Sequence, residues 1–296
     1  MSSHNDHAAP VDPVTGMATT GHSWDGISEL NTPLPRWWLW IFYATIVWSV
    51  GYFVVYPSWP LAQSFTQGIW NWSSRAAVSA DLAELQEMRS ADNAKLAAMP
   101  LADVAKDPKM LAFAQAQGKA AFGDNCAPCH GAGGGGAKGY PNLNDDDWLW
   151  GGKIEQILET ITVGIRSTHP QTRAGAMTAF GAAPSPILNK EQIGQVADYV
   201  LSLSGKADPK ADVKAGQQIF AENCAVCHGD NAKGNQDLGA PNLTDAIWLY
   251  GSDKATIVEA VTNGRGGVMP TWSGRLDDTT IKSLAVYVHT LGGGVK

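Results

Sequence analysis

The sequence predicts an all-α protein, in which one N-terminal transmembrane helix precedes two tandem helical domains of the same kind. Three observations support this fold class. Residues 37–56 form an uncharged apolar run of membrane-crossing length. The chain after residue 109 repeats itself, so that FGDNCAPCHG returns as FAENCAVCHG. Runs typical of strands are nearly absent, whereas apolar residues recur at helical spacing.

Residues 1–36 form a polar N-terminal tail with one Arg, no Lys and four acidic groups. Scattered Gly, Pro, Ser and Thr predict a segment that is poorly ordered unless a partner binds it. The three histidines of this tail, His4, His7 and His22, are therefore expected to be structural or solvated.

The run from Trp37 to Tyr56 contains no charge and can cross a hydrocarbon core of about 30 Å as one helix. Trp residues cluster at its start, and Tyr52, Tyr56 and Trp59 mark its end, as interfacial anchors do. A cleavable signal peptide would have a short basic lead and a shorter apolar run. The segment is therefore predicted to be an uncleaved transmembrane helix.

Residues 57–108 are predicted to be a helical connector between this anchor and the repeats. The stretch 73–120 is rich in Ala, Leu and alternating charge, with Pro100 and Pro108 as expected breaks. This composition indicates short helices rather than a flexible tether.

All four cysteines lie in two Cys-x-x-Cys-His motifs, at 126–130 and 224–228. A disulfide framework gives no reason for the following histidine, and zinc-binding histidines usually stand farther away in sequence. Attachment of c-type haem explains both features. On a helical turn, residues i, i+3 and i+4 share one side, so two thioethers and an imidazole can reach one porphyrin.

The sequence thus predicts two covalently attached haems c, in domains spanning residues 109–205 and 206–296. In each domain an entry helix, the haem motif, a glycine-rich loop, a middle helix, a second loop and a closing helix follow one another. The covalent haem ligands are Cys126, Cys129, Cys224 and Cys227, and the axial histidines are His130 and His228.

The closing segments EQIGQVADYVLSLSG and TTIKSLAVYVHTLGG both carry apolar residues at i, i+3, i+4, i+7 and i+10. Both end at a glycine, so both are predicted to be amphipathic helices. Asn189 is the expected N-cap of the first, with Gln192 completing a capping box. His289, on the second, is expected to be structural or solvated.

Met177 in GAMTAFG and Met269 in GVMPTWSG lie in aligned loops between a haem motif and a closing helix. Equivalent placement favours sixth ligands of the haem irons over core gap-fillers. In the first repeat the rival ligand is His169, in an insertion that the second repeat lacks. A second protein ligand leaves the iron only electron transfer, and His/Met ligation raises its potential.

Each methionine is expected to serve the haem of its own repeat, because a compact domain closes most simply that way. If the two repeats interlock, Met177 would instead face the second haem and Met269 the first. The sequence leaves this alternative open.

The block GHSWDGISELNTPLPRWWLWIFYATIVWSVGYFVVYPSWP, followed by two cytochrome c-type domains, resembles the membrane-anchored dihaem FixP/CcoP subunit family of cbb3-type cytochrome c oxidases. The resemblance extends from end to end. It implies a subunit, not an enzyme by itself, that takes electrons from a donor cytochrome c. The electrons would pass to the monohaem subunit and then to the catalytic subunit, which reduces O₂ and pumps protons in aerobic or microaerobic respiration. TPLPRWW resembles the family's contact with the catalytic subunit.

Haem attachment in bacteria takes place in the periplasm, which places the haem domains there and the single helix in the inner membrane. Arg36, beside the start of the helix, agrees with a cytoplasmic N-terminus. The partners expected are the oxidase subunits, the donor cytochrome and the membrane, but no nucleic acid. The formal charge of −7 serves solubility or steers a basic cytochrome c, with Asp145, Asp146 and Asp147 as candidates for steering.

Two other functions share parts of this pattern. A haem-bearing subunit of another membrane oxidoreductase would have the same ligands, and only the anchor block argues against it. A dihaem peroxidase needs one iron open to substrate, and a methionine in each repeat argues against that.

Overall fold

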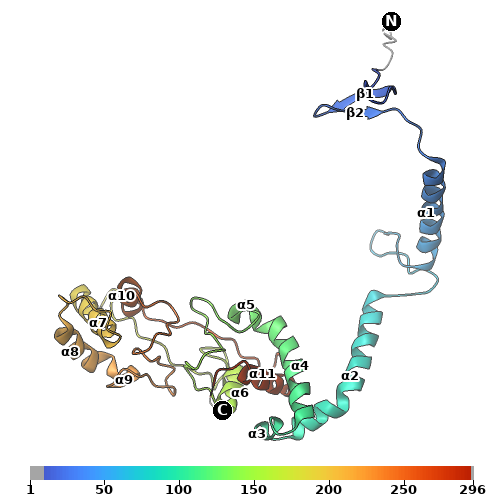
Figure 1. Ribbon diagram of the computed structural model, residues 1–296. Helices are drawn as coiled ribbons and strands as arrows, with labels where there is room; N and C mark the ends of the chain where they lie inside the picture. Colours follow the sequence, from blue (N-terminus) through green and yellow to red (C-terminus); the bar gives the residue numbers. More distant parts are fainter. Residues whose placement is uncertain (1–9, 295–296) are drawn as a thin grey trace. The chain divides into compact units, whose positions relative to one another are not determined.

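In the computed structural model, residues 10–294 are described. The chain divides into two units, Met1–Gln86 and Glu87–Lys296, and both haem motifs lie in the second (Figure 1). Helices make up most of the described chain, as the sequence predicts.

The N-terminal unit contains a small hairpin that the sequence analysis missed. Strands β1 (Thr19–Trp24) and β2 (Ile27–Leu30) pair antiparallel across Asp25 and Gly26, which both have positive φ. Asp-Gly is a strong signal for a two-residue hairpin turn, and it stands in the sequence. The expectation of a poorly ordered tail is therefore wrong for residues 19–30. His22 stacks on Trp24, while His4 and His7 lie outside the described residues.

Helix α1 (Arg36–Val55) matches the predicted span within one residue at each end. It is apolar on all sides, and none of its residues is buried, as expected of a helix whose solvent is lipid. Among residues 10–294 it is the one helix long and apolar enough to cross a membrane. The following loop returns to its end, where Ile69 and Trp70 donate backbone hydrogen bonds to Val54 and Val55.

The connector consists of α2 (Ser74–Ala98), α3 (Leu101–Val104) and the start of α4 (Pro108–Asn125). Pro100 separates α2 from α3, as predicted. Pro108 begins α4 instead of breaking a helix, because a first-turn residue needs no backbone N–H. Asp107 caps this helix by accepting from the backbone of Lys109 and Met110. The connector thus contains one long helix where several short ones were expected.

The repeats contain the predicted elements in the predicted order. The first repeat comprises α4, α5 (Ala127–His130), α6 (Ile154–Val163) and α7 (Lys190–Leu203). The second comprises α8 (Val213–Asn223), α9 (Ala225–His228), α10 (Lys254–Asn263) and α11 (Asp278–His289). Asn189 and Gln192 form the expected capping box on α7, with two hydrogen bonds of 3.0 Å.

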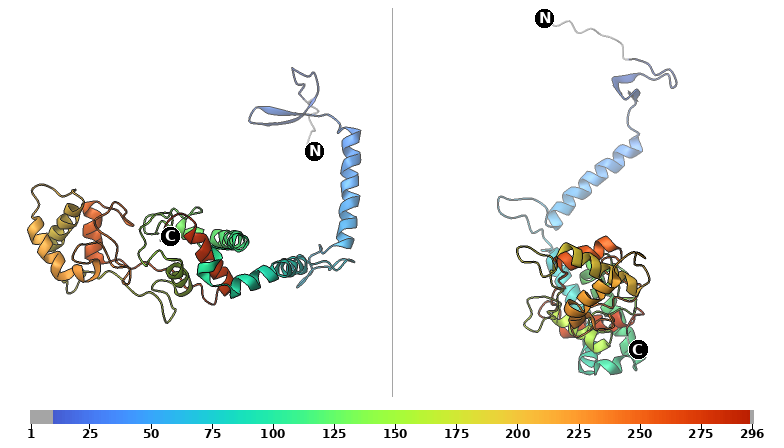
Figure 2. Two further views of the ribbon diagram at one scale, coloured as in Figure 1. Left: turned by 60° about the horizontal axis from the view of Figure 1, so that its bottom comes forward. Right: turned by 90° about the vertical axis from the view of Figure 1, so that its left-hand side faces the viewer.

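The two repeats exchange their closing helices. Helix α11 packs on α4 and α6, and α7 packs on α8 and α10 (Figures 1 and 2). We call α4, α5, α6 and α11 the first lobe, and α7, α8, α9 and α10 the second lobe. The core of the first lobe contains Phe122, Ile157, Ile161, Ile281, Leu284, Ala285 and Val288. Each lobe therefore takes its closing helix from the other sequence repeat.

The chain crosses between the lobes at two short antiparallel backbone pairs. Ile165 and Met269 exchange hydrogen bonds of 2.9 and 3.0 Å, and Met177 and Arg265 exchange bonds of 2.9 and 3.3 Å. Gly164 and Gly264 precede these pairs, both with φ of 71°. A Cβ on Gly164 would lie 2.6 Å from the Met269 carbonyl oxygen, and one on Gly264 still closer to that of Met177. Glycine therefore permits both crossings.

Candidate haem sites

In each lobe the entry helix ends at the first cysteine of the haem motif, and a one-turn helix carries the rest. The His130 backbone donates to the Cys126 carbonyl at 2.9 Å, and His228 donates to Cys224 at the same distance. The predicted helical turn is confirmed. It brings the cysteines and the histidine of each motif to one side of the backbone.

The imidazole of each motif is held in one tautomer. Nδ1 of His130 lies 3.0 Å from the Pro141 carbonyl oxygen, and Nδ1 of His228 lies 3.0 Å from that of Pro241. A carbonyl only accepts, so Nδ1 carries the proton and the lone pair of Nε2 is free for a metal. Burial lowers the pKa of both histidines, with the carbonyl bond opposing in part, so both imidazoles are neutral near pH 7 as ligands must be.

These carbonyl partners are not among the residues predicted from the sequence. Their signal was present, because PNL follows each haem motif at the aligned positions 141–143 and 241–243.

None of the four cysteines is in a disulfide, so all four remain available for thioether attachment to a vinyl group. Cys126 and Cys224 are half-buried, whereas Cys129 and Cys227 are exposed. Burial, with a contribution from the neighbouring cysteine, raises the pKa of the Cys126 and Cys224 thiols to about 11.

A cavity of about 840 Å³ lies beside the haem motif of the second lobe, and part of its wall comes from the loop after the first haem motif, within residues 135–149. Cys224, Cys227 and His228 line it together with Met177 from the other repeat. Apolar side chains form much of the remaining wall, including Val196, Val200, Phe220, Ile257 and Val261. The size is that of a cofactor pocket, and the donors fit a haem: two thiols, one free imidazole nitrogen and one thioether.

In the first lobe the other methionine packs on the same core as the first cysteine of the haem motif. Met269 packs on this core together with Cys126, Leu143, Trp148 and Trp272. The expectation that each methionine faces the motif of its own repeat is therefore wrong. The cause is the exchange of the closing helices, because each methionine lies between a crossing point and an exchanged helix.

His169, the rival ligand, lies in the insertion of the first repeat. Its Nδ1 accepts a hydrogen bond from the Gln171 backbone at 3.1 Å, and its own backbone donates to Ser167 Oγ. It is not among the residues that line the second cavity, whereas Met177 is. The structure thus brings Met177, not His169, to the second haem motif.

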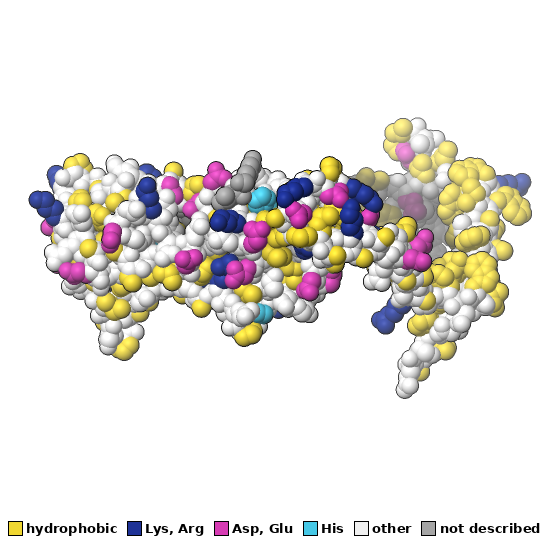
Figure 3. Space-filling model, turned by 90° about the horizontal axis from the view of Figure 1, so that it is seen from below, with side chains coloured by type: hydrophobic (Ala, Val, Ile, Leu, Met, Phe, Trp, Pro, Cys, Tyr) yellow, Lys and Arg dark blue, Asp and Glu magenta, His cyan; other side chains and the backbone are white. Residues whose placement is uncertain are grey.

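The acidic run at 145–147 is only partly a solvated loop. Burial raises the pKa of Asp147 to about 6, with further contributions from Asp245 and Asp145. On the face shown in Figure 3, acidic and basic side chains are interspersed over the larger unit rather than gathered by sign.

Helical domains with a Cys-x-x-Cys-His motif for covalent haem define the c-type cytochromes. Comparison with known proteins agrees with this class. The family model for cytochrome c matches residues 115–204. The model described as cytochrome c oxidase, cbb3-type, subunit III matches residues 211–288. The N-terminal domain of cytochrome oxidase-cbb3, FixP, matches residues 16–63.

Curated relatives match over nearly the whole chain. The cbb3-type cytochrome c oxidase subunit FixP of Azorhizobium caulinodans is 62% identical over 294 residues, covering 99% of each chain. Subunit CcoP of Azospirillum brasilense is 51% identical, covering 96% of this chain and 98% of the relative. FixP of Rhizobium meliloti is 47% identical, covering 96% and 97%. The chain belongs to this FixP/CcoP family of cbb3-type oxidase subunits, as the resemblance implied.

Proposed function

We propose that this chain is the electron-relay subunit of a cbb3-type cytochrome c oxidase and binds two haems c, one in each lobe. The observation that carries the proposal is the closure of both sites, because a methionine stands with each haem motif. An iron with two protein ligands can exchange electrons but cannot bind O₂ or peroxide.

The ligand sets follow the lobes rather than the repeats. The first haem is attached at Cys126 and Cys129, with His130 and Met269 on its iron. The second is attached at Cys224 and Cys227, with His228 and Met177. The bound haem supplies a one-electron couple, and the soft methionine sulfur raises its potential toward that of an oxidase.

The partners are the catalytic and monohaem subunits and a donor cytochrome c. The match of residues 16–63 to the FixP N-terminal domain supports the contact with the oxidase subunits, because this stretch contains the hairpin, TPLPRWW and all of α1. Helix α1 crosses the inner membrane once with its N-terminus cytoplasmic. The haem lobes are periplasmic, where covalent haem is attached.

The test is a haem and ligand analysis of the detergent-solubilised full chain, followed by oxidase assays with and without it. We expect two covalent haems on a denaturing gel, no carbon monoxide binding by the reduced protein, and loss of donor oxidation when the subunit is missing. Carbon monoxide binding at one haem would contradict a relay role for that lobe. Unimpaired donor oxidation without the subunit would contradict the proposal as a whole.

A further inference from the structure

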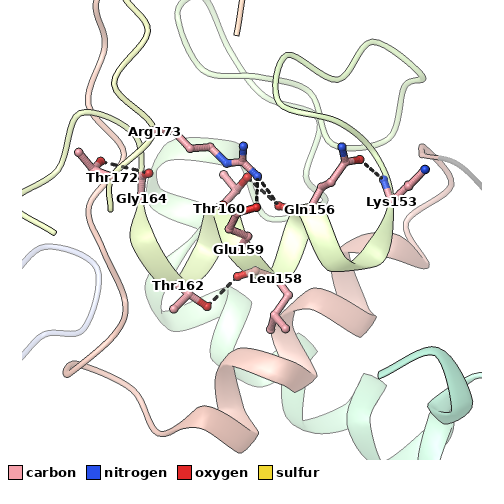
Figure 4. Close-up of polar contacts among 9 residues, drawn as sticks. All are labelled: Lys153, Gln156, Leu158, Glu159, Thr160, Thr162, Gly164, Thr172 and Arg173. Atoms are coloured by element: carbon pink, nitrogen blue, oxygen red, sulfur yellow. Dashed lines mark hydrogen bonds and ion pairs between the residues drawn. The ribbon is translucent and has the colours of Figure 1, made fainter. Parts of the chain in front are cut away.

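Two arginines have the same surroundings in the two lobes. Arg265 pairs with Glu259 of α10 at 3.2 Å, and its guanidinium lies 4.6 Å from the ring centre of Tyr250. Arg173 pairs with Glu159 of α6 at 2.8 Å (Figure 4), and its guanidinium lies 5.3 Å from the ring centre of Trp150.

The acidic and aromatic partners are aligned in the sequence repeat, but the arginines are not. Glu159 and Glu259 align, as do Trp150 and Tyr250, whereas the residue aligned with Arg265 is Ile165. Arg173 comes from the insertion of the first repeat and reaches the place through a parallel bridge to Ile165. A guanidinium thus arrives at both places from different sequence positions, which indicates a requirement shared by both sites.

The ion pairs do not account for this requirement. Both glutamates are largely exposed, and exposed pairs contribute little to stability. The Nε–H groups of both arginines are instead buried and have no hydrogen-bond partner among the described residues. A buried N–H group without a hydrogen bond costs folding free energy. We therefore expect one further hydrogen-bond acceptor beside each arginine.

The place of Arg265 indicates what that acceptor is. Arg265 lines the cavity that contains His228 and Met177, and its backbone is hydrogen-bonded to that of Met177. The carboxylates of a haem are its two propionates, and a guanidinium binds a carboxylate with charge-assisted hydrogen bonds. Arg166 lines the same cavity, but its Nε and one terminal nitrogen already donate to the carbonyls of Gly267 and Gly175.

We propose that Arg265 binds a propionate of the second haem and Arg173 a propionate of the first, and that each arginine raises the potential of its haem. This rests on the haems proposed above. A guanidinium offsets the negative propionate and favours the ferrous iron, which carries one positive charge fewer than the ferric iron. Arg173 serves the first haem because α6, which holds its partners Glu159 and Gln156, supplies Ile157 and Ile161 to the first core.

The test compares Arg265→Gln, Arg173→Gln and Glu259→Gln with Lys254→Gln in the full chain. Lys254 also lies on α10 but pairs with Asp198 at 2.7 Å and does not line the cavity, so it controls for loss of a charge. The readouts are the two reduction potentials and the propionate bending bands in the resonance Raman spectrum.

We expect Arg265→Gln to shift the redox equilibrium of the second haem about tenfold toward the ferric state, which is about 59 mV for one electron. Its propionate band should move, while the first haem keeps its potential. Arg173→Gln should instead lower the potential of the first haem and move its propionate band, while the second haem keeps its potential. Glu259→Gln removes a competing anion and should raise the potential of the second haem, and Lys254→Gln should leave both haems unchanged.

Unchanged propionate bands and potentials in Arg265→Gln, with the haem attached and methionine-ligated, would overturn the proposal and leave the relay function standing. If Arg265→Gln does not incorporate haem, the Glu259→Gln variant tests the proposal. An unchanged or lowered potential of the second haem in Glu259→Gln would also overturn the proposal. A wild-type chain without two covalent haems would instead refute the proposed function.

Discussion

The two lobes are built on one plan, but among residues 10–294 the hydrophobic core that includes connector residues belongs to the first lobe. Leu96 and Val104 of the connector share a core with Met110 and Ala114 of α4 and Val286 of α11. Lys282 of α11 also donates to the carbonyls of Leu96, Ala97 and Met99, at the end of α2. The last helix of the second repeat therefore holds the first lobe to the connector. A repeat in sequence is thus not a unit of packing in this chain.

Among the tests of this comparison, a core substitution on an exchanged helix has the largest expected effect on stability. Leu284→Ala on α11 removes a fully buried side chain and should cost about 2–5 kcal/mol. Because α11 packs in the first lobe, the first haem should be the one released or disordered. Val196→Ala on α7 is the matched change and should affect the second haem. Spectra of both haems during denaturant unfolding measure this, and damage confined to the haem of the mutated repeat would contradict the exchange.

Removal of a methionine tests the crossed ligation directly. In a chain with Cys126→Ala and Cys129→Ala, only the second haem remains attached. There Met177→Ala should open the iron, admit carbon monoxide and lower the potential, because the thioether ligand is lost. Met269→Ala should leave the same haem closed. The opposite result would show that each methionine ligates the haem of its own repeat.

The crossing glycines have a smaller expected effect. Gly264→Ala forces a Cβ against the Met177 carbonyl at a φ of 71° and should cost about 1–3 kcal/mol. The same strain should weaken the charge-transfer absorption of the methionine-ligated ferric haem. Gly194→Ala, at an open position on α7, is the control and should be neutral or slightly stabilising. Equal stability of the two variants would show that the crossing tolerates a side chain.

The smallest expected effect concerns Asp147, which aligns with Ile247 and so has no counterpart in the second lobe. Its folded pKa of about 6 lies above the usual value of 3.8, because burial and the nearby Asp245 and Asp145 favour the neutral form. The folded state holds this proton more tightly, so its contribution to stability is present below pH 3.8 and is lost as the pH rises through 6. Asp147→Asn should therefore raise Tm at pH 7.5 and leave it unchanged at pH 3.5, whereas Asp146→Asn, at an exposed neighbour, should change neither. A lower Tm at pH 7.5 would show that the carboxylate stabilises the lobe.

Much of the molecule was predictable because its signals are local. The uncharged run at 37–56 specifies α1 by length and composition, and the cysteine and histidine spacing specifies α5 and α9 by helical geometry. The stripes of α7 and α11 and the capping box at Asn189 follow from helical periodicity and N-cap chemistry. The hairpin at Asp25 and Gly26 was equally local, and the polar composition of the tail concealed it.

Tertiary structure alone decided which methionine belongs to which haem motif. The two closing helices present nearly the same apolar stripe, so either could cover either entry helix, and periodicity does not distinguish the two arrangements. The choice depends on contacts distant in sequence, such as Ile165 with Met269 and Met177 with Arg265. The same holds for Arg173, which reaches its place from an insertion that no alignment of the repeats would match to Arg265. Local chemistry determined the parts of this chain, and the path of the backbone between the lobes determined how they are paired.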